Sequence, residues 1–247
     1  MSLEEVALLV LVGAVSAFIN TLAGGGSMLT LPALMMIGLP ADLANGTNRV
    51  AVLAQSVTGA HGFDQAGQLD RSALISILMP TISGAALGAL AASILPNSWL
   101  KPILLITMMI VALSLLVPRK SVRRRPTALK EKSRWPALAL FITGLYGGFI
   151  QAGVGFMLVA VISRFLQYDL VRSNAIKAVC TGVFSGVALL VFAIQGQVLW
   201  LTGVVLALGS IAGAYLSVRF TLNVRESVLR TLLVIMVMSS CVAALWI

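Results

Sequence analysis

Long apolar runs separated by short polar turns dominate the chain. Spanning about 30 Å of hydrocarbon as an α-helix takes about 20 mostly apolar residues. Runs of that length lie roughly at 43–62, 72–93, 99–117, 171–194, 197–218 and 227–246. Two further regions, 6–38 and 136–167, are about 32 residues long, which is too long for one straight span. Glycines interrupt both, and each region is therefore expected to break and to fold back as a re-entrant hairpin.

The two halves of the chain repeat each other. A shift of 129 residues aligns positions 23–117 with 152–246 without a gap, giving about 21 identities in 95 positions. The identities include the glycines of both breaks and the pair Asn45 and Asn174. Three regions are expected: a first repeat at 1–117, a basic linker at 118–135 and a second repeat at 136–247.

Composition excludes several classes of protein. Apolar residues make up 59% of the chain and charged residues 10%, against about 45–50% and about 25% in soluble domains. This excludes a soluble globular enzyme, a disordered chain and a nucleic-acid-binding domain. The net charge of +9 therefore indicates membrane topology and not a nucleic-acid partner.

The basic residues choose between two topologies. If each broken region crosses the membrane once, the 17 Lys and Arg residues divide 9 to 8 between the two sides. If each broken region returns to its starting side, the repeats are inverted and the division is 15 to 2. Because cytoplasmic loops collect positive charge, we expect a cytoplasmic linker and two extracytoplasmic termini. The expected fold is an all-α polytopic membrane protein of two inverted repeats, with four helical elements in each. Each repeat opens with a glycine-broken re-entrant or discontinuous helix.

Inverted repeats with discontinuous helices in matching places are typical of secondary transporters. A helix that restarts after Gly26 would present free N–H groups and a positive dipole end to the membrane midplane, which suits an anion. The alternative is that glycines only permit close helix packing. We favour that alternative for Gly84 with Gly88 and for Gly209 with Gly213.

Polar residues near the breaks extend the candidate site. Asn45 with Arg49, and Asn174 with Lys177, each place an amide and a cation on one face of a helix. Both cations could instead extend to lipid headgroups from the starts of their helices. Gln55 and Ser56 are expected to hydrogen-bond across helix contacts. The candidate substrate-binding residues are Asn20, Gly24, Gly25, Gly26, Asn45, Asn48, Arg49, Gln151, Gly153, Gly155, Asn174 and Lys177.

Two motifs of the first half resemble a known family. The sequence AGGGSMLTLP at 23–32, followed by NGTN at 45–48, is similar to the sulfite exporter TauE/SafE family of membrane transporters. The resemblance implies movement of small sulfur-containing or carboxylate anions across the bacterial inner membrane. The second copy reads AGVGF at 152–156 and has no proline matching Pro32, so the halves are expected to contribute unequally.

The expected function is secondary transport of a small anion, such as sulfite, an organosulfonate or a related sulfur-containing or carboxylate anion, by alternating access. The alternatives are an anion channel and a non-transporting membrane assembly subunit. An enzyme is not expected, because the single His lacks a nucleophile or metal cluster. We expect no cofactor or metal. The expected partners are the small anionic substrate and the lipid bilayer, and assembly into a homo-oligomer stays open.

The charge division generates a topology prediction. A reporter fused after Ile247 should read as extracytoplasmic, because the inverted arrangement returns the chain to the side on which it began. Alkaline phosphatase and green fluorescent protein fusions would measure this. A cytoplasmic signal would contradict the inverted arrangement.

Overall fold

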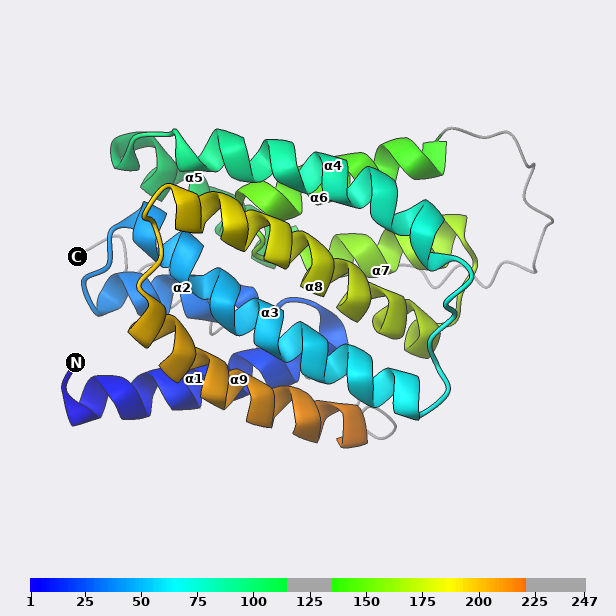
Figure 1. Cartoon of the computed structure of the whole chain (residues 1–247), viewed down its shortest axis with the longest axis horizontal. Coiled ribbons are helices and arrows are strands. Elements are labelled where there is room, and N and C mark those ends of the chain that lie inside the picture. Colours follow the sequence, from blue (N-terminus) through cyan, green and yellow to red (C-terminus); the bar gives the residue numbers. More distant parts are fainter. Residues whose placement is uncertain (115–134, 221–247) are drawn as a thin grey trace.

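A computed structural model describes residues 1–114 and 135–220, and every regular element within these ranges is a helix (Figure 1). The helices are α1 (Leu3–Ala23), α2 (Ser27–Met36), α3 (Ala41–Gln65), α4 (Leu74–Ser93), α5 (Asn97–Ser114), α6 (Trp135–Phe149), α7 (Val154–Phe165), α8 (Leu170–Ile194) and α9 (Trp200–Phe220). The all-helical fold expected from the sequence is confirmed.

The expected elements and breaks agree closely with these helices. The region 6–38 divides into α1 and α2 around Gly24–Gly26, and the region 136–167 divides into α6 and α7. The expected helix at 227–246 and the linker at 118–135 lie outside the described residues, except that Trp135 already begins α6. In the described part of the chain, α1, α4, α8 and α9 are long and apolar enough to cross a membrane.

Helix directions divide the described helices into two opposed sets. Gly59 of α3 faces Ala178 of α8, whereas Leu53, earlier in α3, faces the later Gly186, so these two helices are antiparallel. In Figure 1, α1 and α2 form a hairpin that returns toward the end marked N, and α6 and α7 form a hairpin from the opposite end. The two halves are therefore inverted, as the sequence predicts.

Helices from different halves pair side by side. α1 runs parallel to α9, with Val10 against Gly209 and Ala14 against Gly213. In the equivalent contact, α4 runs parallel to α6 and brings Gly84 onto the carbonyl oxygen of Phe141. The expectation that these glycines serve close packing is confirmed, because each would drive a Cβ into the backbone of the neighbouring helix.

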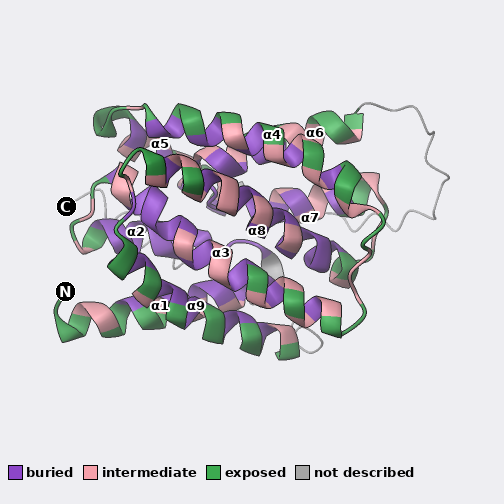
Figure 2. Ribbon diagram, in the orientation of Figure 1, coloured by how far each residue is buried: buried purple, intermediate pink, exposed green. Residues whose placement is uncertain are grey.

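Burial follows the position of each helix. Nearly all of α2 is buried, together with most of the N-terminal halves of α3 and α8 (Figure 2). The outer faces of α1, α4 and α9 expose large apolar side chains such as Leu11, Ile75 and Leu208. Exposed apolar faces around a buried polar interior match a helix bundle that has lipid as its surroundings.

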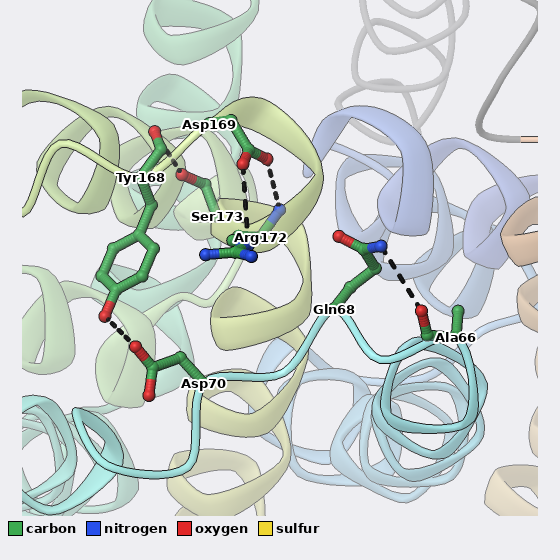
Figure 3. A network of polar contacts seen from close by, with 7 residues as sticks. All are labelled: Ala66, Gln68, Asp70, Tyr168, Asp169, Arg172 and Ser173. Carbon is green, nitrogen blue, oxygen red and sulfur yellow. Dashed lines mark hydrogen bonds and ion pairs between the residues drawn. The ribbon is translucent and has the colours of Figure 1, made fainter.

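A loop contact joins the halves at the end where α3 and α7 finish. The hydroxyl of Tyr168, before α8, donates to Asp70, before α4, at 2.7 Å (Figure 3). Hydrogen bonds from Ser72 and Tyr168 lower the pKa of Asp70 to about 2. Asp70 is therefore a carboxylate at neutral pH and accepts a charge-assisted hydrogen bond from the other half.

The glycine packing generates a stability prediction. Gly84→Ala should lower the melting temperature, because its methyl group has no room against the α6 backbone, and overpacking costs about 1–3 kcal/mol. Gly186→Ala is the matched control, since a Cβ there would lie 3.9 Å from Leu53 in ordinary contact. Thermal unfolding in detergent measures both. Equal stability of the two variants would contradict the close packing of α4 on α6.

Candidate functional site

The first arm of each hairpin ends inside the molecule. α1 stops at Ala23, where Gly24 takes the left-handed conformation with φ +97° that glycine adopts without strain. α6 stops at Phe149, and Gln151 shortly afterwards is also left-handed, with φ +67°. The last carbonyl groups of a helix have no partner within that helix, and a membrane interior supplies no water to satisfy them.

Two side chains of α8 satisfy the end of α1. The Lys177 Nζ donates to the carbonyl oxygens of Asn20 at 2.7 Å and Thr21 at 3.2 Å. The Asn174 Nδ2 donates to the carbonyl of Leu22 at 3.3 Å, and its Oδ1 accepts from Lys177 at 2.8 Å. Lys177 and Asn174 therefore cap the C-terminal end of α1.

Two side chains of α3 satisfy the end of α6 in the same manner. The Arg49 guanidinium donates to the carbonyls of Gly147 at 2.6 Å and Gly148 at 2.8 Å. The Asn45 Nδ2 donates to the carbonyl of Phe149 at 2.8 Å, and its Oδ1 accepts from Arg49 at 3.1 Å. The amide and cation pairs found in the sequence are therefore two equivalent caps.

Each cap comes from the opposite half of the chain. α3 of the first half caps α6 of the second, and α8 of the second half caps α1 of the first. Both cations point into the protein, since Arg49 has 0% and Lys177 3% of its surface exposed. The alternative that these two side chains extend to lipid headgroups is therefore wrong.

The buried cations have no acidic partner within residues 1–114 and 135–220. The ion pairs of those ranges, Arg71 with Asp64 and Arg172 with Asp169, lie at the surface. The C-terminal end of a helix carries about half a negative charge, so each helix end offsets part of one cation. Among the described residues, part of the positive charge of each cation is therefore left without a negative partner. No group of three or more His, Cys, Asp or Glu that could hold a metal occurs in these ranges.

Asn20 and Gln151 precede the two breaks and were expected to correspond, but the caps show a different correspondence. The caps make the carbonyl of Asn20 equivalent to that of Gly147. The shift along the sequence that relates these two residues is two residues shorter than the shift that relates Asn45 to Asn174. The second half therefore has two extra residues after α6, and the ungapped repeat alignment places Gln151 among them. Gln151 is not the counterpart of Asn20.

Gln151 has a packing role of its own in the second break. Its Oε1 accepts from Arg49, and its Nε2 donates to the Ser185 Oγ at 3.0 Å. It is fully buried. The amide therefore fills the space between the α6 end and α8.

The candidate glycines of the two breaks lie against one another. A Cβ on Gly24 would come 2.5 Å from Gly155, and Gly153 faces the side chain of Met28. Gly26 packs on α1, where its carbonyl accepts from Ser16 at 2.7 Å, and Gly25 is buried beside it. The breaks thus meet backbone to backbone, and these glycines do not line the pocket described next.

A polar pocket lies beside the capped end of α1. In this conformation the enclosed space holds about one water molecule, and the empty volume of about 250 Å³ includes open solvent beyond the mouth. Residues of α1, α3 and α8 line it: Asn20, Thr21, Gln55, Ser56, Gly59, Phe63, Lys177, Ala178 and Thr181. The hydroxyl of Thr181 is buried and has no hydrogen-bond partner in the described part of the chain. Asn48 is also buried and has no hydrogen-bond partner within residues 1–114 and 135–220, but it lies outside the pocket.

Sequence reasoning missed several residues of this pocket. Thr21 and Thr181 carried no signal beyond being polar in an apolar run. Gln55 and Ser56 were expected to hydrogen-bond between helices, which is wrong for the residues described, where neither side chain makes a hydrogen bond and both line the pocket. The identity of Ser56 with Ser185 across the repeat was the available signal.

The cap of α6 generates a prediction. Arg49→Gln should destabilise the protein by about 3 kcal/mol, because removing a buried charge from its partners leaves them unsatisfied. Chemical denaturation in detergent measures the loss. Arg172→Gln is the control, since Arg172 is exposed at the start of α8. Unchanged stability of the Arg49 variant would show that the α6 carbonyls find other donors.

Comparisons with known proteins agree with this architecture. The family model described as sulfite exporter TauE/SafE matches residues 9–244. A "Probable membrane transporter protein" of Haemophilus influenzae is 27% identical, covering 95% of this chain and 92% of the relative. The "Probable membrane transporter protein YfcA" of Escherichia coli K12 is 26% identical, covering 91% and 83%. The comparison with solved structures gave no significant match.

Proposed function

Because the chain belongs to the sulfite exporter TauE/SafE family, we propose that it is a secondary transporter of a small anion. The anion is sulfite, an organosulfonate or a related sulfur-containing or carboxylate anion, and it crosses the inner membrane by alternating access. The family and the names of the relatives support the broader statement that the chain is a multi-pass membrane transporter and not an enzyme.

One observation carries the choice of an anion. Arg49 and Lys177 are buried in the interior without an acidic partner in the part of the chain described. Buried charges in membrane proteins are costly and usually line a substrate pathway. The remaining positive charge at the two helix ends favours an anionic substrate over a cationic one.

The swapped caps suggest how the two halves move together. The end of α1 is bound to α8 and the end of α6 to α3. A shift of α8 relative to α3 therefore moves the tip of the α1–α2 hairpin with α8. The glycines between α1 and α2 and between α6 and α7 supply the backbone freedom that such a shift needs. Alternating exposure of the candidate residues would follow from exchange between two such arrangements.

Orientation is part of the proposal. Four of the five described basic side chains outside the interior lie at the end where α3, α7 and α9 finish: Arg71, Arg164, Arg172 and Arg219, whereas Lys101 lies at the other end, near the start of α5. The positive-inside rule assigns that end to the cytoplasm. The linker is then cytoplasmic and both termini are extracytoplasmic.

The source of driving force is a gradient of the substrate or of a coupled ion, or a separate ATPase partner. The sequence contains no phosphate-binding loop of the Gly-x-x-x-x-Gly-Lys-Ser/Thr type. Ion pairs of the described residues are confined to the surface, which gives an acidic proton relay no support. An anion channel and an assembly subunit are the competing functions.

Reconstitution tests the proposal. Purified protein in liposomes should take up sulfite, thiosulfate or a small carboxylate at a rate that saturates with concentration, because a carrier binds its substrate in every cycle. Radiolabelled or enzymatically detected uptake measures this, with empty liposomes as the control. Large currents that rise linearly with voltage would favour the channel, and absence of flux would favour the assembly subunit.

A further inference from the structure

We propose that the pocket between α1, α3 and α8 is the anion-binding site, and that its counterpart beside Arg49 is closed. This inference rests on the proposed function and assigns its binding site to one of two related positions. It adds Gln55, Ser56 and Thr181 to the residues that contact the substrate.

The pocket offers neutral hydrogen-bond donors that the protein itself does not use. The Thr181 hydroxyl is buried without a partner among the described residues. Gln55 and Ser56 are 3% and 5% exposed, and their side chains make no hydrogen bond in the same ranges. Because an unsatisfied buried polar group costs about 1–3 kcal/mol, the Thr181 hydroxyl, beside the pocket-lining Gln55 and Ser56, points to a ligand.

Lys177 supplies the charge of the site. Its three N–H groups are directed to Asn20, Thr21 and Asn174, so the ammonium is held in position before a ligand arrives. No acidic side chain contacts it in the described structure. The ammonium therefore attracts the anion electrostatically, while the hydroxyl and amide groups of the pocket form the hydrogen bonds.

The equivalent position in the other half has lost these features. The repeat alignment places Phe184 where the open pocket has Gln55, and Val52 where it has Thr181. Gln151 occupies the space beside Arg49 and donates to Ser185, the counterpart of Ser56. Phe184 is fully buried there. An apolar wall and a committed amide thus fill the space beside Arg49, although the Arg49 Nε–H and the Asn48 amide have no partner among the described residues.

The donors define the chemical class of the ligand. Three hydroxyls and two amides beside one ammonium suit a compact oxyanion whose several oxygens accept hydrogen bonds, such as a sulfur oxyanion or a carboxylate head group. A halide lacks separate directional acceptor atoms. The pocket lies toward the end where α3 finishes and α8 begins. Under the proposed orientation, this conformation holds its site on the cytoplasmic side.

Alanine substitutions of the equivalent residues Ser56 and Ser185, together with a substitution of Thr181, test the assignment. Ser56→Ala and Thr181→Val should each raise the apparent Kd about tenfold or more, as expected for one lost hydrogen bond to a charged partner. Ser185→Ala, at the equivalent position of the closed side, should leave it within about twofold of the wild type, far below that effect. The probes are sodium sulfite, thiosulfate and acetate, with sodium chloride as the reference. Binding is measured by the anion-induced rise in melting temperature, and the KM by uptake into liposomes.

Gly59→Ala separates loss of binding from loss of folding. A Cβ on Gly59 would lie 3.8 Å from Ala178 and from the Thr21 side chain, in ordinary contact, and would enter the pocket. Alanine in a helix is about 1 kcal/mol more favourable than glycine, so the variant should melt slightly higher without anion. Its response to the anion should be smaller than that of the wild type.

The outcomes distinguish the site from the function. Wild-type transport with normal binding in the Ser56, Thr181 and Gly59 variants, or weaker binding in the Ser185 variant alone, would overturn the assignment and leave the transporter proposal standing. If the wild type neither binds nor moves any of the anions, both proposals fail.

Discussion

The C-terminal carbonyl groups of α1 and α6 are the constraint on which the rest of the structure depends. A helix that ends inside a membrane protein leaves these groups without water, and here a buried cation with a neighbouring amide satisfies each end. The solution fixes the position of α3 against α6 and of α8 against α1. It also explains why two charges are tolerated in an apolar interior, since the negative end of a helix dipole offsets part of their cost. The close glycine contacts of α1 with α9 and of α4 with α6 then enclose this centre.

Much of the fold could be predicted because a membrane limits the alternatives. Spans need apolar runs of a known length, and glycine clusters show where a longer run must break. The division of charge selected the inverted arrangement over the parallel one, and the opposed directions of α3 and α8 agree with it. The pairing of α1 with α9 across the two halves was not predictable, because apolar periodicity does not say which neighbour a helix chooses.

The candidate site was harder to predict than the fold. The pairs Asn45 with Arg49 and Asn174 with Lys177 were visible as repeated polar residues on one helix face. Their partners are backbone carbonyl groups of distant helices, and a sequence carries no mark of a carbonyl that lacks a partner. The difference between the halves depends on a two-residue insertion at the second break and on aromatic or aliphatic substitutions such as Phe184. These are ordinary core residues until the geometry shows which space they fill.

Each half of the chain caps a helix of the other half, which has a consequence for how such a protein is assembled. When the first half enters the bilayer, the end of α1 waits for α8, which is synthesised about 150 residues later. Until then the hairpin must remain near water or the insertion machinery, since lipid offers its carbonyls no donor. One half alone could complete its break only by pairing with an oppositely oriented copy. The two repeats thus make, within one polypeptide, the contacts that two oppositely oriented copies of one half would make.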